Sequence, residues 1–350
     1  MTDDDLVLPN PELPYGTGVI GVCDVCGERQ AIIVLQKERF KLCVLDFLNK
    51  TWTATKNAPG RPLPAYRSER VWFPSGADPS GQAQGVLLRP TKPVKRPAIL
   101  LTPDLFGLTT MLLDAGIRFA RAGFEVLLPD VAKLDALGPM DLMSLHGEAK
   151  VRGGLRLDST PARRLIGLYA DALRFLREQP LVDPARTGVF GASNGATIAL
   201  GLASTDPTLA AVAVAFPVPS RPPDSLRLIN APLLVLAGDA DPLAARARAQ
   251  LESAGIAGSV PVRYELYPGA RHLFLARDHR AYDLPRAEQA WERLLTFYKD
   301  TLMPAPPKPP AAPVAKATPP AAPAPVTAAP APGPSGPTPS TAPKSPAPSA

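Results

Sequence analysis

Short apolar runs alternate with longer amphipathic segments from about residue 85 to about residue 302 of this chain. Several of the short runs, such as PLLVLAG, are apolar almost throughout, which is typical of strands buried on both faces. Such an alternation indicates strands that are each followed by a helix. The sequence therefore predicts an α/β fold, in which a mostly parallel sheet carries helices on both faces.

The expected elements follow from this pattern. The predicted strands cover residues 85–90, 97–102, 124–130, 187–193, 209–216, 232–238 and 262–268. The predicted helices cover residues 109–123, 162–179, 194–204, 243–254 and 285–302. Open sheets of this kind carry their active sites at the carboxyl ends of the strands.

Composition divides the chain into three parts. Residues 1–60 hold all three cysteines, and residues 61–303 form the expected α/β domain. Residues 304–350 contain 18 of the 45 prolines, set among alanines, with no aromatic or acidic residue. Because such a segment cannot bury enough apolar surface to fold, we expect a disordered tail, which is a candidate for binding a protein partner.

Charge and hydropathy exclude several partners. The formal net charge is +6, and Lys308, Lys316 and Lys344 of the tail supply three of these charges, so no basic run is left for nucleic acid. The acidic start MTDDDLVLPN does not resemble a signal peptide, and the longest apolar stretch is far shorter than the roughly 18 residues that indicate a membrane span. Three cysteines are too few for a disulfide scaffold. We therefore expect a cytoplasmic protein without a nucleic-acid or membrane partner.

The string GASNG at residues 191–195 is the sharpest local signal. It follows an apolar run and precedes the helical run ATIALGL. In a nucleophile elbow, a serine occupies a strained turn between a strand and a helix, and glycines two residues to either side let the two elements approach. This context makes Ser193 the candidate nucleophile.

A serine hydroxyl needs a base to remove its proton, and the chain has three histidines. His272 lies in YPGARHLF, directly after the last predicted strand, where it can reach the elbow. His146 lies in a poorly patterned region, and His279 is flanked by charged residues and is expected to be solvated. His272 is therefore the candidate base.

An acid should orient the imidazole, and it should follow an intervening strand. The strand PLLVLAG ends in Gly-Asp-Ala-Asp-Pro, which offers Asp239 and Asp241. Asp241 is the candidate acid and Asp239 is the alternative. Asp241 is also a candidate N-cap of the helix that Pro242 begins, and the two roles compete for one side chain.

Backbone amides should stabilise the negative charge on the substrate carbonyl oxygen. One amide belongs to the residue after the nucleophile, Asn194. The other should come from the loop PDLFG at residues 103–107, where Pro103 lacks an amide hydrogen and Leu105 is the best candidate.

The segments PDLFG, LLPDV, GASNG, LAGDADP and YPGARHLF resemble, in this order, the dienelactone hydrolase family of α/β-hydrolases over about residues 65 to 300. The resemblance implies the α/β-hydrolase fold, with Ser193, Asp241 and His272 as the catalytic triad. It also implies the amides of Leu105 and Asn194 as the oxyanion hole, and hydrolysis of a small ester or lactone without a cofactor.

The sequence departs from the family pattern in two places. The name-giving enzymes carry a cysteine nucleophile, whereas Ser193 stands here and favours a broader carboxylesterase-like activity. The family loop commonly has a glutamate near the nucleophile, and the shorter Asp104 stands in that place. Arg271 and Arg277 flank the histidine and are candidates for pairing with a substrate carboxylate, the alternative being that both are simply solvated.

The N-terminal cysteines resemble a zinc knuckle. Cys23 and Cys26 form one C-x-x-C turn, and Cys43 and Asp46 repeat the spacing with a carboxylate in the last place. Zinc accepts both ligand types, so the hypothesis is a structural zinc site, with the runs AIIVLQ and RFKLCV forming a hairpin between its halves. The alternative is a decayed knuckle in which Asp46 caps a helix.

Two functions of different classes fit these features. The first is a serine hydrolase that acts on a small ester or lactone. The second is an inactive hydrolase fold that binds protein partners through the cysteine segment and the proline-rich tail. Because a scaffold has no need to keep three catalytic groups in order, the sequence favours the enzyme.

Overall fold

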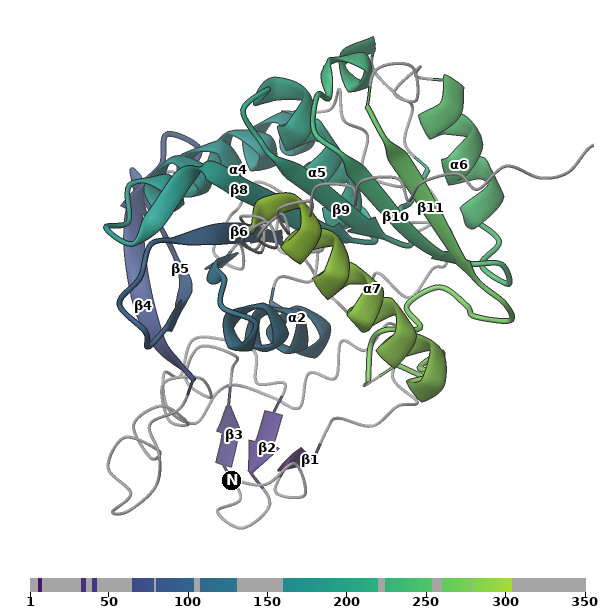
Figure 1. Ribbon diagram of the computed structural model, residues 1–350, viewed down its shortest axis with the longest axis horizontal. Helices are drawn as coiled ribbons and strands as arrows, with labels where there is room; N and C mark the ends of the chain where they lie inside the picture. Colours follow the sequence, from purple (N-terminus) through teal and green to yellow (C-terminus); the bar gives the residue numbers. More distant parts are fainter. Residues whose placement is uncertain are drawn as a thin grey trace, which may run out of the picture. The chain divides into compact units, whose positions relative to one another are not determined.

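The structure, a computed structural model, describes residues 6–7, 33–35, 40–42, 65–78, 80–103, 108–130, 160–219, 224–253, 260–277 and 279–303 (Figure 1). The chain divides into two units, Met1–Ala305 and Pro306–Ala350, and all described residues lie in the first.

An eight-stranded sheet forms the centre of the described α/β region, with the strand order β11-β10-β9-β8-β6-β7-β5-β4. All neighbouring strands are parallel except β5, which runs antiparallel to both β4 and β7. The mostly parallel sheet predicted from the sequence is therefore confirmed. The strands are β4 (Tyr66–Pro74), β5 (Gln82–Pro90), β6 (Arg96–Thr102), β7 (Glu125–Asp130), β8 (Val182–Ala192), β9 (Ala211–Ala215), β10 (Leu233–Gly238) and β11 (Val262–Tyr267).

Helices cover both faces of this sheet, as predicted (Figure 1). The helices α2 (Thr110–Arg121) and α7 (Leu284–Leu302) pack on one face, and α4 (Thr160–Arg177) and α5 (Asn194–Thr205) pack on the other. Successive strand residues alternate between these two layers, because side chains of a strand point to opposite faces in turn. Leu101 packs with α2 and α7, for example, whereas Leu100 packs with α4 and α5.

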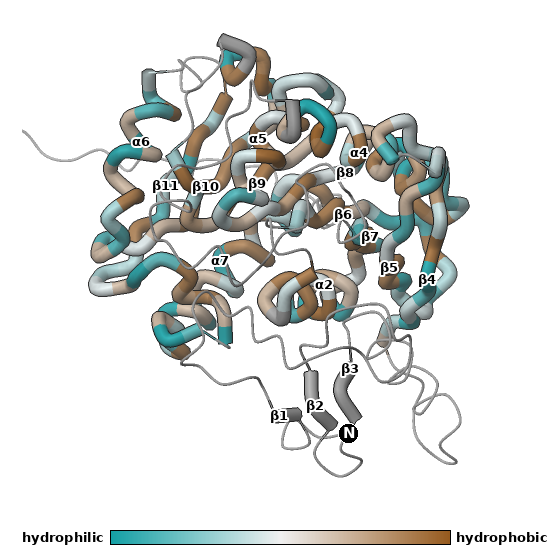
Figure 2. The backbone as a smooth tube through the Cα atoms, turned by 180° about the vertical axis from the view of Figure 1, so that it is seen from behind, coloured by the Kyte–Doolittle hydropathy of each residue, from teal (hydrophilic) through white to brown (hydrophobic). Residues whose placement is uncertain are grey.

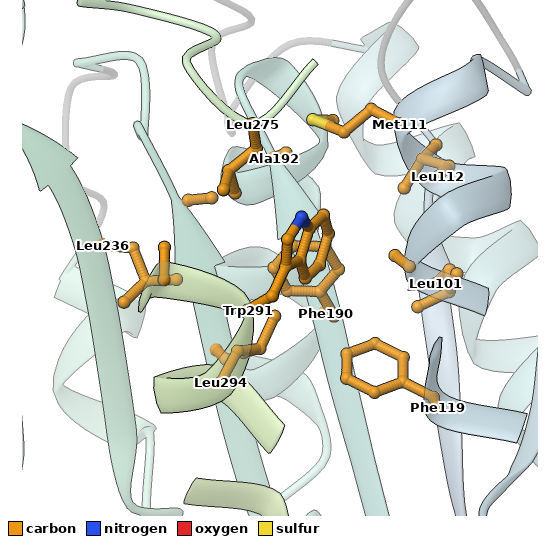
Figure 3. Close-up of a cluster of buried hydrophobic side chains, with 14 of the residues drawn as sticks. Leu101, Met111, Leu112, Phe119, Phe190, Ala192, Leu236, Leu275, Trp291 and Leu294 are labelled. Carbon is orange, nitrogen blue, oxygen red and sulfur yellow. The ribbon is translucent and has the colours of Figure 1, made fainter. Parts of the chain in front are cut away.

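The core beneath α2 and α7 is rich in aromatic side chains. Figure 3 shows Trp291 of α7 and Phe119 of α2 beside Phe190 of β8. The ring of Phe119 meets that of Phe190 edge-on, with 5.9 Å between the ring centroids. Hydrophobic stretches run along the central strands in Figure 2, whereas the helices mix hydrophobic and hydrophilic stretches. Helix α5 is the exception. It is buried from Asn194 to Ser204, and its sequence is accordingly apolar over most of its length.

Several elements differ from the sequence expectation, most of them by a few residues at one end. Strand β4 was not predicted, because this edge strand buries only Ser68 and Phe73 and shows no apolar alternation. Strand β8 begins at Val182 rather than at residue 187, in a polar stretch that the apolar pattern could not reveal. Strand β9 ends at Ala215 rather than at residue 216, because the backbone of Phe216 leaves the extended conformation. The helices α6 (Ala244–Ser253) and η4 (Asp224–Leu228) complete the described α/β region, and η4 was not predicted.

Near the N-terminus, β1 (Leu6–Val7), β2 (Ile33–Leu35) and β3 (Phe40–Leu42) form a separate sheet. The pairing of β2 with β3 is antiparallel, as the predicted hairpin requires. Cys23, Cys26, Cys43 and Asp46 lie outside the described residues, so the zinc hypothesis stays a prediction. Among the helices that the structure describes, none combines the length and the apolar character needed to cross a membrane.

Candidate active site

Ser193 occupies the turn between β8 and α5. Its backbone has φ 54 and ψ −124, a conformation that non-glycine residues rarely adopt. Ser193 precedes the first residue of α5, where a serine side chain normally caps the helix, but it makes no such capping hydrogen bond. The hydroxyl is therefore left for another partner, as a nucleophile elbow requires.

Close backbone contacts explain the two glycines of the elbow. A Cβ atom on Gly191 would lie 2.2 Å from the carbonyl oxygen of Gly195 and 2.3 Å from Oγ1 of Thr102. A Cβ atom on Gly195 would lie 2.2 Å from the carbonyl oxygen of Thr102. Thr102 is itself buried, and its hydroxyl donates to the Gly195 carbonyl at 2.8 Å. The close approach of strand and helix predicted from the glycine spacing is thus confirmed.

The loop after β11 brings His272 to Ser193. Nε2 of His272 lies 3.4 Å from Oγ of Ser193, and Nδ1 lies 2.7 Å from Oδ2 of Asp241. Catalytic hydrogen bonds are often long before substrate binds, so the 3.4 Å separation suits a resting site. The three side chains form one chain of contacts in the order serine, histidine and aspartate, which can move a proton from the hydroxyl to the imidazole.

The two aspartates after β10 have different partners. The side chain of Asp241 is fully buried; its Oδ1 accepts a hydrogen bond from the Leu243 amide at 2.9 Å while Oδ2 faces His272. One carboxylate therefore holds both the loop before α6 and the imidazole, so the two roles do not compete as the sequence suggested. Asp239 is exposed and accepts from the Gly269 amide at 2.5 Å. Its carboxylate fixes the backbone of the histidine loop rather than the imidazole.

The acid loop and the histidine loop are in direct backbone contact. The Ala240 amide donates to the carbonyl oxygen of Ala270 at 3.1 Å. A Cβ atom on Gly238 would lie 2.0 Å from that same carbonyl oxygen. Glycine at the end of β10 is therefore required for Asp241 and His272 to come together.

The structure describes some of the remaining predicted site residues but not all of them. Asn194 is the first residue of α5 and is buried beside Ser193, whereas Asp104 and Leu105 lie outside the described residues. Arg271 and Arg277 are both exposed. Burial raises the pKa of Asp114, against the smaller lowering effects of Arg118 and Arg277, so the charge of Arg277 acts on this protein carboxylate.

His279 is partly exposed, so it is less solvated than the sequence suggested, and His146 lies outside the described residues. The Nδ1 atom of the half-buried His279 side chain accepts a hydrogen bond from the Ala281 amide at 3.0 Å. Burial first, then the charges of Arg280 and His272, lower its pKa to about 4. His279 is therefore a neutral group of the histidine loop near neutral pH.

Other buried charged side chains lie at the amino ends of the strands, opposite the candidate site. Glu125 begins β7 and Arg96 begins β6, so both lie at the amino ends of parallel strands. Oε1 of Glu125 lies 2.7 Å from Nη1 of Arg89, and burial raises the pKa of Glu125 against the lowering effects of Arg89, Arg96 and Arg67. Since the candidate site lies at the carboxyl ends, this cluster belongs to the framework of the fold.

Phe216 is a site residue that the sequence did not reveal. It follows β9, and its ring meets the imidazole of His272 edge-on with 5.2 Å between the ring centroids. The run LAAVAVAF looks like an uninterrupted strand, and the only local signal for a change of direction is the following Pro217.

Comparison with known proteins gives one family. The family model described as the dienelactone hydrolase family matches residues 83–302. A Bradyrhizobium protein described as a probable 2-oxo-3-(5-oxofuran-2-ylidene)propanoate lactonase is 27% identical over 225 residues, which make up 61% of this chain and 87% of that protein.

Solved structures support the same fold. A dienelactone hydrolase from Anabaena variabilis superposes with a TM-score of 0.51 at 21% identity and covers 68% of this chain and 100% of its own. The dienelactone hydrolase-like promiscuous phosphotriesterase P91, from metagenomic libraries, superposes with a TM-score of 0.54 at 21% identity and covers 68% of this chain and 99% of its own. These similarities confirm the predicted α/β-hydrolase fold.

Proposed function

Since the chain belongs to the dienelactone hydrolase family, we propose that it is a serine hydrolase that cleaves a small ester or lactone through an acyl-enzyme. The observation that carries this proposal is the chain of contacts from Ser193 through His272 to the buried Asp241, with separations of 3.4 and 2.7 Å. The strained backbone of Ser193 supports it, because strain of this kind concentrates at functional sites.

The first half of the proposed reaction acylates the enzyme. Nε2 of His272 takes the hydroxyl proton as Oγ of Ser193 attacks the carbonyl carbon of the substrate. Asp241 stabilises the imidazolium, and the Asn194 amide, at the amino end of α5, donates to the oxyanion. The imidazolium then returns its proton to the leaving alkoxide as the ester bond breaks. For a lactone, that alkoxide stays attached to the acyl group.

The second half releases the acid. His272 takes a proton from a water molecule, whose oxygen attacks the acyl carbon, and returns it to Oγ of Ser193 as the acyl bond breaks. Each proton thus has a donor and an acceptor among these residues and water, so we propose that no cofactor takes part. Leu105 is the proposed second oxyanion donor.

The substrate class rests on the relatives and on the surroundings of His272. The Bradyrhizobium relative is described as a lactonase, and a serine nucleophile suits carboxylic esters in general. Arg271 is exposed next to His272 and, together with Arg277 and Asp104, is a candidate for contacting a polar substituent of the substrate. Bidentate pairing with a carboxylate is the contact that an arginine makes best.

Labelling with a fluorophosphonate probe tests the proposal, because the probe phosphonylates an activated serine. We expect the wild-type protein to be labelled and to hydrolyse 4-nitrophenyl acetate. Ser193→Ala should lose the label and at least about 10³-fold of the turnover. Ser204→Ala is the matched control, since Ser204 is also buried but lies in the last turn of α5, where its hydroxyl donates to the Gly201 carbonyl. Persistent labelling of Ser193→Ala, or a wild-type protein that takes no label, would overturn the proposed function.

A further inference from the structure

Positive backbone φ angles gather around the candidate site. Among the residues that the structure describes, the non-glycine residues with positive φ are Ser193, Phe216 and Leu273. Ser193 is the elbow serine, and Leu273 directly follows His272. Phe216, with φ 35, is the least expected of the three, because a bulky side chain at positive φ is a genuine outlier. Such an outlier persists only where its surroundings enforce it.

The positive φ of Phe216 reverses the alternation of β9. Ala213 and Ala215 pack on the face with α2 and α7, whereas Val212 and Val214 pack on the opposite face. A regular strand would carry residue 216 to the face of Val214. Phe216 instead joins the face of Ala215, where the histidine loop also packs. The backbone distortion therefore decides on which side of the sheet the ring lies.

The Ala215–Phe216 segment contacts the elements that carry all three triad candidates. The Ser193 amide donates to the Ala215 carbonyl at 3.0 Å. The Phe216 amide donates at 2.6 Å to the carbonyl of Leu236, in the strand that leads to Asp241. The Phe216 ring meets His272. This segment is thus the common neighbour of the elbow, the acid strand and the base.

The ring of Phe216 packs against another aromatic ring. It is fully buried, and Phe274 meets it edge-on with 6.0 Å between the ring centroids. Phe274 in turn packs against Tyr267, the last residue of β11, at 5.1 Å. The ring consequently has little room to move away from the imidazole, while Asp241 holds the imidazole through Nδ1.

We propose that Phe216 is a positioning residue that keeps the imidazole of His272 turned with Nδ1 toward Asp241 and Nε2 toward Ser193. The proposal rests on the serine-hydrolase function proposed above. Removal of the ring would leave space beside the imidazole and admit other side-chain orientations, in which Nε2 no longer faces the hydroxyl. A misplacement of about 1 Å in an active site can cost about 10²-fold in rate.

The test compares Phe216→Leu with Phe119→Leu. Phe119 is a matched control, because it is equally buried and contacts other aromatic rings but lies in the core between α2 and β8, away from His272. We expect Phe216→Leu to slow fluorophosphonate labelling and to lower kcat on 4-nitrophenyl acetate by about 10- to 100-fold, with KM within about 3-fold. Phe119→Leu should lose a similar amount of thermal stability but keep both rates. Phe216→Met, which also lacks the ring, replaces Phe216→Leu if that variant does not fold.

A proton NMR spectrum provides a direct readout of the imidazole. The chain has three histidines, so ¹⁵N-histidine labelling leaves few imidazole signals to assign. The downfield Nδ1–H signal of His272 should be sharp in wild type and in Phe119→Leu, and broadened in Phe216→Leu. Wild-type labelling rates in Phe216→Leu, or an equal slowing in Phe119→Leu, would overturn the role of Phe216 alone. Absence of labelling in the wild-type protein would overturn the hydrolase function and this inference together.

Discussion

Replacing Asp241 with asparagine should remove most of the esterase activity and leave the fold intact. The Asp241 carboxylate is fully buried, with Oδ1 bonded to the Leu243 amide at 2.9 Å and Oδ2 at 2.7 Å from Nδ1 of His272. Asparagine keeps one oxygen for the Leu243 amide. Its NH₂ group, however, is a donor at the point where the imidazole also needs to donate.

The size of the effect follows from this geometry. An amide beside Nδ1 favours the tautomer with the proton on Nε2, which cannot accept the proton of Ser193. Loss of the correct tautomer in a serine triad lowers kcat by about 10⁴, which corresponds to about 5 kcal/mol of transition-state stabilisation. Since the bond to the Leu243 amide is kept, the free energy of unfolding should fall by less than about 1 kcal/mol, the usual worth of a lost cap.

Asp239→Asn is the matched control for this change. Oδ1 of Asp239 accepts from the backbone amide of Gly269, and asparagine can keep that bond. We expect its kcat on 4-nitrophenyl acetate to stay within about 3-fold of wild type, because about 0.7 kcal/mol is all that a weakened exposed hydrogen bond should cost. Steady-state kinetics and thermal melts of both variants are the assay. A larger kcat loss in Asp239→Asn than in Asp241→Asn would refute the assignment of the acid.

Three further predictions concern the glycine contact, the half-buried His279 and the metal. Gly238→Ala should lower kcat/KM by about 10²-fold and the free energy of unfolding by about 1–3 kcal/mol, because its Cβ would meet the Ala270 backbone. In the control Gly76→Ala, the Cβ would have nothing within 4 Å, so both quantities should stay at their wild-type values. The pKa of His279 is lowered from 6.5 to about 4, so the unfolded chain binds more protons between these values and stability falls as the pH drops through this window. His279→Asn keeps an acceptor for the Ala281 amide. In chemical denaturation from pH 7 to pH 4, its free energy of unfolding should fall by about 1–2 kcal/mol less than that of wild type, after a discount for solvent screening. Equal falls in the free energy of unfolding of the two proteins would contradict this. Elemental analysis should find about one zinc per chain, bound by Cys23, Cys26, Cys43 and Asp46, and its removal should spare esterase activity; a substoichiometric content in protein prepared with zinc present and no chelator would favour the decayed knuckle.

The central strands could be predicted because strands buried on both faces have continuous apolar sequences. Strand β10 is buried along its whole length, and so its residues are apolar without interruption. The edge strand β4 has the opposite character, since Arg67 and Trp72 are exposed and only Ser68 and Phe73 are buried. Its pairing with β5 depends on backbone hydrogen bonds, which leave no hydrophobic pattern to read.

The site was predictable where the chemistry dictates the local sequence. An elbow needs glycines at fixed offsets, so Ser193 could be found from five residues. The sequence could not separate the two roles of Asp241, because only the structure shows that each carboxylate oxygen has its own partner. Phe216 could not be found at all, since its importance comes from a reversed strand alternation and from contacts with His272 and Leu236, which are distant in the sequence.

The two halves of the candidate site are held together by the same kind of contact. Gly195 faces the carbonyl oxygen of Thr102, and Gly238 faces that of Ala270. A backbone carbonyl cannot rotate away as the tip of a flexible side chain can, so a Cβ atom at either glycine would have to displace a whole strand end or loop. The backbone positions of Ser193 and His272 are thus set by main-chain contacts at these two glycines, whereas the orientation of the imidazole also depends on its side-chain neighbours Asp241 and Phe216.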